Sequence, residues 1–479
     1  MNRKMILSIT GSILIAEAAM LLLPMIVSLV YGEACAFPFA VTALGAAIVG
    51  LVLRRLCRAK DSTLYAKDGF VTVALSWLAV SLVGAVPFVL SGAIPNYVDA
   101  LFETVSGFTT TGATILTDVE ALPHGLLFWR SFTHWIGGMG VLVFILAIVP
   151  SVSDSSIHIL RAEMPGPVVG KLVPRARDTA SILYGIYLGM TALEIVLLLC
   201  GGMPVFDSVV HAFGTAGTGG FGIKADSIAG YSAYLQWVIT VFMILFGVNF
   251  NLYYLILIRR FRSAAQSTEL WSYFGIIGVA VAAVAWNIRG LYSAADAVRH
   301  SAFQVASIIT TTGFSTVDFD AWPQFSRAVL LLLMVVGACA GSTGGGLKVS
   351  RVVMLFKMVR KEIRVLLRPR TVSAVRMEGK PVDQMTLGSV GTYLACYVFC
   401  GVVLFLVVSL ENFSLETNLS AVLACFNNVG PGLGLVGPLG SYAIYSPLSK
   451  LVLSFGMLLG RLEIYPLLIF LHLGSTKRS

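Results

Sequence analysis

Four short stretches of this 479-residue chain decide its fold: Thr110-Thr111-Gly112-Ala113, Thr218-Gly219-Gly220-Phe221, Thr311-Thr312-Gly313-Phe314 and Asn428-Val429-Gly430-Pro431. We call the residue triplets that end on the central glycines glycine segments 1 to 4. The central glycines lie about a hundred residues apart. Four copies of one unit can surround a single axis, and a ring of backbone carbonyls on that axis can replace the water around a cation. The repetition therefore predicts a pore with fourfold pseudo-symmetry.

Composition places the chain in a membrane. Hydrophobic residues make up 57% of the sequence and charged residues only 12%, whereas ordinary soluble domains carry about 25% charged residues. The glycine segments also lie between apolar stretches of helix length. We therefore expect an all-α polytopic membrane protein. The connections between the apolar stretches are too short to form a soluble catalytic domain, so we predict no enzyme.

The distribution of charge predicts the topology. The net charge is +9, but most of the 33 Lys and Arg residues lie in alternate inter-helix segments and at the two termini, which argues against nucleic-acid binding. The positive-inside rule places both termini in the cytoplasm and the glycine segments toward the outside. The seven cysteines are scattered, and nothing beside them completes a metal site. We expect no tightly bound cofactor.

The chain divides into a hairpin and four pore repeats. The N-terminal transmembrane hairpin covers residues 1–60, and the repeats cover residues 61–150, 151–262, 263–370 and 371–479. Each repeat reads as a span, a short helix, a glycine segment and a second span. The expected short helices are too short to cross a bilayer and should enter and leave on one side: Val98–Phe108, Val205–Phe213, Ala294–Ile309 and Leu415–Phe426.

Three of the four second spans are expected to be continuous: Leu126–Val149, Tyr234–Ile258 and Leu448–Leu473. The second span of repeat 3, Ala328–Val359, is expected to be interrupted. Acidic residues near the starts of the short helices suit the positive end of the helix dipole and make the mouth of the pore attractive to cations. They are Asp99, Asp207, Asp296 and Glu416.

The glycine segments have the composition of a cation filter. Glycine supplies backbone dihedrals that aim carbonyl oxygens inward, and threonine adds a hydroxyl group. The predicted ion-binding residues are Thr110, Thr111, Gly112, Thr218, Gly219, Gly220, Thr311, Thr312, Gly313, Asn428, Val429 and Gly430. Segment 4 departs most from the pattern and is followed by Pro431, so the symmetry should be approximate.

The interruption in repeat 3 is the run Gly341-Ser342-Thr343-Gly344-Gly345-Gly346. Three consecutive glycines weaken a helix, and the freed backbone groups need water or protein partners. We interpret the run, together with Lys348, as a flexible loop across the pore that acts as a gate. A helix kink that serves packing is the alternative. A phosphate-binding loop is excluded, because Leu347 and Lys348 occupy its two final positions.

Arg461 lies well inside the last apolar span. A charge at that depth faces a cavity or a partner, and we interpret this one as a pore-facing group that anchors the gating loop. Glu463, at a spacing of two, points to another helix face and cannot be its simple partner. A salt bridge from Arg461 to another helix is the alternative.

The chain resembles the Trk/Ktr/HKT superfamily of potassium uptake proteins, and within it the TrkH-type subunits. Besides the glycine segments, the resemblance covers nearly the whole length and includes His134-Trp135-Ile136-Gly137-Gly138-Met139-Gly140, Gly247-Val248-Asn249-Phe250-Asn251, Gly341 to Lys348 and Gly460-Arg461-Leu462-Glu463. It implies potassium selectivity, because serine replaces the glycine at the Gly112 position in sodium-permeable relatives. It also implies that Arg461 lines the pore beneath an intramembrane gating loop.

The resemblance further implies a bacterial inner membrane location, a dimer of complete pores and a cytoplasmic nucleotide-binding regulatory subunit of the TrkA type. That subunit would dock on the basic stretch Lys348–Arg370, for which anionic lipid headgroups are another partner. Potassium, with rubidium as its analogue, is the expected substrate. A proton- or sodium-coupled secondary potassium symporter is the alternative for the whole chain.

Overall fold

The computed structural model describes residues 2–57, 66–140, 176–370 and 373–475. Within these ranges the chain is helical, apart from one small antiparallel hairpin of strands β1 (Arg376–Met377) and β2 (Lys380–Pro381). Six helices in the described ranges are long and apolar enough to cross a membrane, or up to eight if each of two bent pairs is one span. The prediction of an all-α polytopic membrane protein is confirmed.

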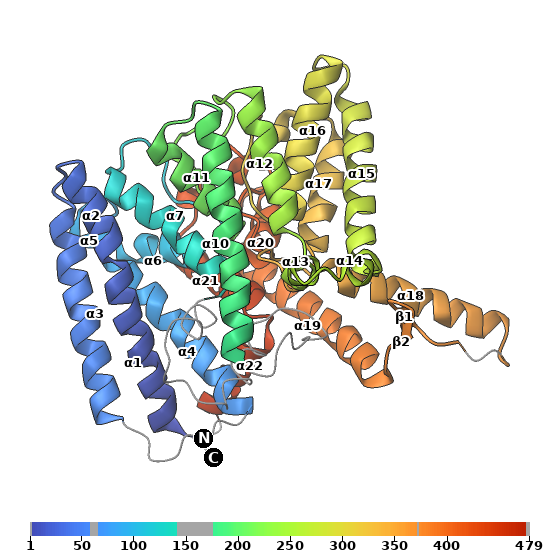
Figure 1. The fold of residues 1–479 in the computed structure, drawn as a ribbon, viewed down its shortest axis with the longest axis horizontal. Helices are drawn as coiled ribbons and strands as arrows, with labels where there is room; N and C mark the ends of the chain where they lie inside the picture. Colours follow the sequence, from blue (N-terminus) through green and yellow to red (C-terminus); the bar gives the residue numbers. More distant parts are fainter. Residues whose placement is uncertain (1, 58–65, 141–175, 371–372, 476–479) are drawn as a thin grey trace.

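An N-terminal hairpin forms one edge of the molecule (Figure 1). It consists of α1 (Arg3–Met20), which continues as α2 (Leu22–Val30), and the antiparallel α3 (Ala36–Leu56). The side of α1 that faces away from α3 packs on the first helix of repeat 1. Glu17 of α1 is fully buried there beside Gly84. The hairpin therefore packs closely against repeat 1.

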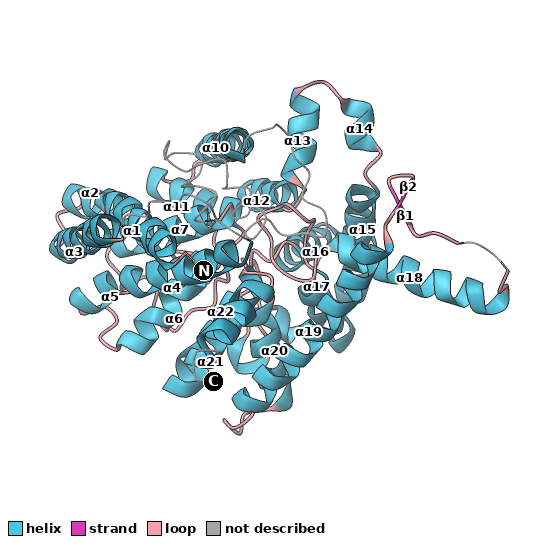
Figure 2. Ribbon diagram, turned by 90° about the horizontal axis from the view of Figure 1, so that it is seen from below, coloured by secondary structure: helices cyan, strands magenta, loops and turns pink. Residues whose placement is uncertain are grey.

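Four repeats follow, each with the predicted order of a first helix, a half-helix and a second helix. The first helices are α4 (Ala66–Gly84) with α5 (Val86–Leu90), α10 (Ala176–Cys200), α15 (Thr268–Ile288) and α19 (Gln384–Val408). The half-helices are α6 (Tyr97–Phe108), α11 (Val205–Gly217), α16 (Ala294–Ile309) and α20 (Leu415–Phe426). Seen from below, the helices of the four repeats surround a central region of loops (Figure 2).

The half-helices begin where the sequence predicts and for the expected reasons. Asn96, Ser293 and Ser414 cap α6, α16 and α20 by accepting backbone N–H groups through their side chains. Helix α11 follows Pro204 instead. An acidic residue stands in the first turn of each half-helix, where it complements the helix dipole.

The second helices correct the sequence analysis. They are α7 (His124–Gly138), α12 (Ala233–Phe246) with α13 (Phe250–Leu257), α17 (Gln324–Val336) with α18 (Val349–Leu367), and α21 (Pro447–Arg461) with α22 (Tyr465–Ser475). The interruption in repeat 3 is present. The spans predicted as continuous in repeats 2 and 4 are wrong, because α12 and α13 meet at 90° and α21 and α22 at 116°.

Both bends have local causes. Asn249 caps the start of α13, which begins a new helix direction after Gly247. In repeat 4, Glu463 and Ile464 have left-handed backbone conformations that no continuous helix accommodates. In repeat 1 the described part of the second helix ends at Gly138, and the predicted continuation over residues 141–149 lies outside the described residues.

Helix α18 extends sideways from the helical body together with the β1–β2 hairpin (Figures 1 and 2). The remaining short elements are α14 (Phe261–Ala265) and the 3-10 helices η2 (Phe319–Ala321), η3 (Gly434–Val436) and η4 (Tyr442–Ile444). The interrupting loop of repeat 3, residues 337–348, thus joins a helix inside the body to a helix that leaves it. We call residues 337–348 the inner loop.

Candidate functional site

The four glycine segments share one backbone conformation. The first residue of each, Thr110, Thr218, Thr311 or Asn428, has a φ between 53° and 60°, and the closing glycine has a φ between 73° and 96°. A left-handed conformation is rare for threonine and costs about 1–3 kcal/mol when a structure imposes it. Its presence at the same place in all four repeats shows that the surrounding fold imposes this conformation.

The shared conformation caps each half-helix and leaves carbonyl groups unused. In segment 1 the N–H of Thr110 donates to Gly107 O (3.1 Å) and that of Thr111 to Ser106 O (2.9 Å). The same pair of bonds, to the third and fifth preceding carbonyls, closes the other three half-helices. The carbonyl oxygens of these two residues in each segment accept no hydrogen bond from any residue that the structure describes.

The four segments close into a ring in chain order. A Cβ atom added to any of the four glycines would meet a carbonyl oxygen of the next segment at a distance that real Cβ atoms essentially never show. Gly112 faces Gly219 O and Gly220 faces Thr312 O. A Cβ added to Gly313 would meet Val429 O. One added to Gly430 would meet Thr111 O of segment 1 at 2.6 Å, which closes the ring. We call Gly112, Gly220, Gly313 and Gly430 the glycine ring.

A cavity of about 130 Å³ lies on one side of the glycine ring and is lined by all four of its glycines. We call it the vestibule. Its other lining residues mostly follow the glycines in sequence and include Arg130. Arg130 forms a buried ion pair with Glu103 at 2.7 Å, donates to Gly222 O and lies 4.0 Å above the Phe221 ring. This arginine thereby ties repeat 1 to repeat 2 at the ring.

The inner loop lies on the other side of the ring. The N–H of Gly345 donates to the hydroxyl oxygen of Thr311 at 2.6 Å. An added Cβ at Gly345 would meet Asn427 O, and one at Gly344 would meet Thr310 O. The loop therefore presses its backbone against residues that precede the ring in repeats 3 and 4, with no room for a side chain.

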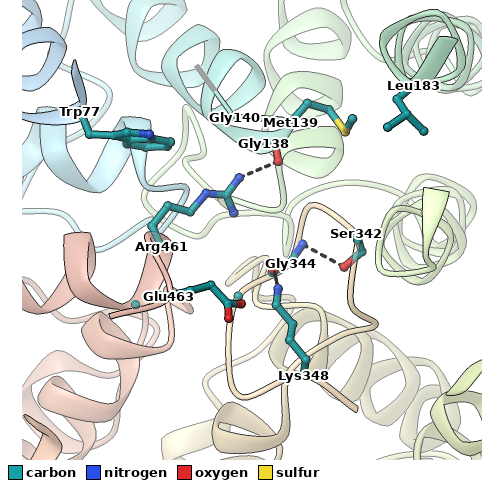
Figure 3. Close-up of a pocket in the computed structure, with 13 residues that line it drawn as sticks. Trp77, Gly138, Met139, Gly140, Leu183, Ser342, Gly344, Lys348, Arg461 and Glu463 are labelled. Carbon is teal, nitrogen blue, oxygen red and sulfur yellow. Dashed lines mark hydrogen bonds between the residues drawn. The ribbon is translucent and has the colours of Figure 1, made fainter. Parts of the chain in front are cut away.

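Two cations hold the middle of the inner loop. Lys348 is buried, and its Nζ donates to Gly344 O. Arg461 donates to Gly138 O at 2.6 Å (Figure 3). It also donates to Thr343 O at 2.8 Å and to Gly137 O. Arg461 therefore joins the inner loop to the end of α7 in repeat 1. These groups line a small cavity of about 40 Å³ beneath the ring.

Two carboxylates hold the ends of the inner loop. Glu269 at the start of α15 accepts the N–H group of Ala340 in the loop (2.7 Å) and that of Ser350 in the first turn of α18, just after the loop (3.0 Å). Glu463 forms an ion pair with Arg351 in the first turn of α18. The expectation that Glu463 is not the partner of Arg461 is consistent with this geometry.

The residues predicted to bind ions and those predicted to form the gate lie in these two places. The twelve residues of the glycine segments include the glycine ring and the residues that directly precede its glycines, and Gly341, Gly344, Gly345, Gly346 and Lys348 lie in the inner loop with Arg461 against it. The sequence analysis missed Glu269, for which the only signal was an acidic residue at the start of a span. It also missed the carbonyls of Gly137 and Gly138 as acceptors for Arg461, although both glycines belong to a motif that the sequence analysis named.

Chemically, the ring offers backbone oxygen. In the described part of the chain, no group of three or more His, Cys, Asp or Glu side chains is placed to hold a metal ion. The unbonded carbonyls of the glycine segments are hard, neutral ligands, which suit a cation without a d-electron preference. The ring therefore offers ligands of the kind that suit a hard cation.

Comparisons with known proteins agree with this geometry. The family model TrkH, described as a cation transport protein, matches residues 38–275 and 281–477. The chain is 34% identical over 478 residues to the Trk system potassium uptake protein TrkH of Salmonella typhimurium, with 98% of each chain covered. It is also 34% identical to TrkG of Escherichia coli, with 93% of each chain covered.

A solved structure agrees as well. The crystal structure of the potassium transporter TrkH from Vibrio parahaemolyticus superposes with a TM-score of 0.88 at 31% identity, covering 98% of this chain and 99% of the other. Sequence and fold both match from end to end. The chain therefore belongs to the TrkH family of cation transport proteins.

Proposed function

We propose that the chain is a potassium-selective pore of the bacterial inner membrane in which the glycine ring is the selectivity filter. The observation that carries the proposal is the closure of the ring, in which every ring glycine lies against a carbonyl of the next repeat. Carbonyl groups with no other partner can replace the hydration shell of a potassium ion. The curated relatives are named potassium uptake proteins, and the chain, as a family member, is a membrane transporter and not an enzyme.

The inner loop is proposed to be the gate. It contacts the ring from the side opposite the vestibule, and Arg461 places a positive charge beside it (Figure 3). A cation that leaves the ring toward the small cavity meets this charge and the loop backbone. The described geometry is then a closed state, and opening requires the loop to leave Thr311 and Arg461.

Helix α18 is proposed to carry the opening signal. It begins directly after the inner loop, and its first turn is joined to Glu463 through Arg351. Its exposed outer part carries basic residues on a helix that projects from the body. We propose that a cytoplasmic nucleotide-binding subunit of the TrkA type docks there, with anionic lipid as a further contact, and that the chain works as a homodimer with both termini in the cytoplasm.

The filter proposal is tested in a bacterial strain that lacks potassium uptake and grows only in high potassium. The wild-type chain is expected to restore growth in low potassium. Gly313→Ala should not, because its methyl group would meet Val429 O. Gly222→Ala is the matched control, since an added Cβ there meets nothing closer than 3.7 Å. With equal amounts of each variant in the membrane, growth of all three strains would overturn the proposal.

A further inference from the structure

One of the four interfaces between repeats packs less extensively than the other three and contains a cavity. In the other three, the second helix of one repeat packs on the half-helix of the next: α7 on α11, α12 on α16, and α21 on α6. Helix α17 of repeat 3 and helix α20 of repeat 4 are also in contact, but less extensively, and a cavity of about 530 Å³ lies between them. We call it the lateral cavity. Cavities of this size are the kind that hold small ligands.

The walls of the lateral cavity are apolar. The cavity is lined by Leu331 of α17, by Leu415 and Leu419 of α20, and by Leu433. The neighbouring surface is also apolar, with Leu332 exposed by 67% and Leu415 by 72%. In a membrane protein such a surface suits contact with hydrocarbon, so an acyl chain matches the chemistry of these walls.

One end of the lateral cavity is charged. Arg327, in the first turns of α17, donates to Asp320 at 3.0 Å and to Glu416 at the start of α20. Its Nε is buried and has no hydrogen-bond partner among the described residues. Both helices begin on the side of the half-helix N-termini, so this end lies at the level where lipid headgroups are found.

The charges at this end select the headgroup. One guanidinium and two carboxylates leave the cluster with an excess of negative charge, which disfavours an anionic lipid. A phosphate diester with a primary ammonium group complements both signs, because the phosphate accepts from the exposed part of the Arg327 guanidinium, whose side chain is 22% exposed, and the ammonium donates to Glu416, which lines the cavity. A quaternary ammonium group has no N–H to donate.

We propose that the lateral cavity binds one phospholipid of the phosphatidylethanolamine type, with its headgroup on Arg327 and an acyl chain between α17 and α20. The bound chain lies directly behind the half-helix that ends in glycine segment 4. Ser420 links that half-helix to the segment after the ring by accepting from Leu433 N at 2.8 Å. The lipid thus supports the repeat whose filter sequence departs most from the others.

The test is native mass spectrometry of the full chain, purified in detergent and supplied separately with phosphatidylethanolamine, phosphatidylcholine or phosphatidylglycerol. The wild type is expected to retain one phosphatidylethanolamine per chain and to lose the other two lipids at least tenfold more readily. Arg327→Gln, which removes the headgroup contact, and Leu419→Trp, which narrows the cavity, should both reduce retention.

Arg299→Gln is the matched control. Arg299 has the same 22% exposure as Arg327, pairs with Asp296 at 2.8 Å and also has a buried Nε without a described partner, but it does not line the cavity. Retention in Arg299→Gln and loss in the two cavity variants, at unchanged melting temperatures, supports the site. Three results would each overturn the proposal. The wild type could retain all three lipids equally, or the Arg299→Gln control could lose lipid as readily as the cavity variants. A cavity variant could also turn a dimer into a monomer without changing the amount of bound lipid.

Discussion

Replacing Gly112 with serine tests the role of the glycine ring at its most constrained point. Gly112 has a φ of 80°, and an added Cβ would meet Gly219 O of the next repeat. A side chain in this backbone region costs about 1–3 kcal/mol before the overlap is counted. The segment can relieve that energy only by moving carbonyls away from the axis, which enlarges the ring.

This strain sets the scale of the expected loss of selectivity for potassium over sodium. If the ring loses about 1.4 kcal/mol of its preference for potassium over sodium, the permeability ratio falls about tenfold. Gly430→Ser is expected to lower the ratio less. A Cβ added to Gly430 would lie 2.6 Å from Thr111 O, whereas one added to any of the other three ring glycines would lie closer to the facing carbonyl oxygen. Gly222→Ser, with no contact closer than 3.7 Å, should leave the ratio unchanged.

The assay is the ratio of rubidium to sodium uptake by the purified chain in liposomes, with thermal unfolding measured in parallel to confirm that each variant is folded. The expected order of lost selectivity is Gly112→Ser, then Gly430→Ser, then the Gly222→Ser control. A folded Gly112→Ser protein with wild-type selectivity would refute the assignment of segment 1 to the filter. So would an equal loss in the control.

Three further variants test the gate. Deleting residues 344–346 removes the contact with Thr311 and should raise unregulated rubidium flux severalfold, whereas lost flux in a folded protein would favour a packing kink. Arg461→Gln frees the carbonyl of Thr343 and should raise basal flux as well, so unchanged flux would contradict its role as an anchor. Glu463→Gln weakens the ion pair with Arg351, so we expect a higher basal rubidium flux and a lower melting temperature. If proteolysis at α18 becomes faster while the flux stays unchanged, the ion pair serves stability alone.

The half-helices and the ring could be predicted because their signals are local and repeated. Each half-helix has an acidic first turn and ends at a glycine segment, and α16 and α20 have the predicted bounds. Four similar segments make an accidental turn a poor explanation. The left-handed conformation of Thr110 and its three counterparts could not be predicted, because their surroundings in the assembled ring impose it.

The bends could not be predicted for the same reason. Leu462-Glu463-Ile464 continues an apolar pattern, yet the chain turns there because Glu463 pairs with Arg351 and Arg461 reaches the carbonyls of α7. Both partners are more than a hundred residues away in sequence. Glu269 was missed because its two bonds join it to the inner loop and to the first turn of α18, 71 and 81 residues further along the chain.

The most direct measurement of the central claim is rubidium and sodium uptake by the purified wild-type chain in liposomes, with the membrane potential clamped and the pH gradient varied. The variant that lacks residues 344–346 is measured beside it, so that a closed gate is not mistaken for an inactive pore. We predict rubidium flux that follows the potential, excludes sodium and ignores the proton gradient. Flux driven by the proton gradient at zero potential would contradict the pore and establish a coupled symporter.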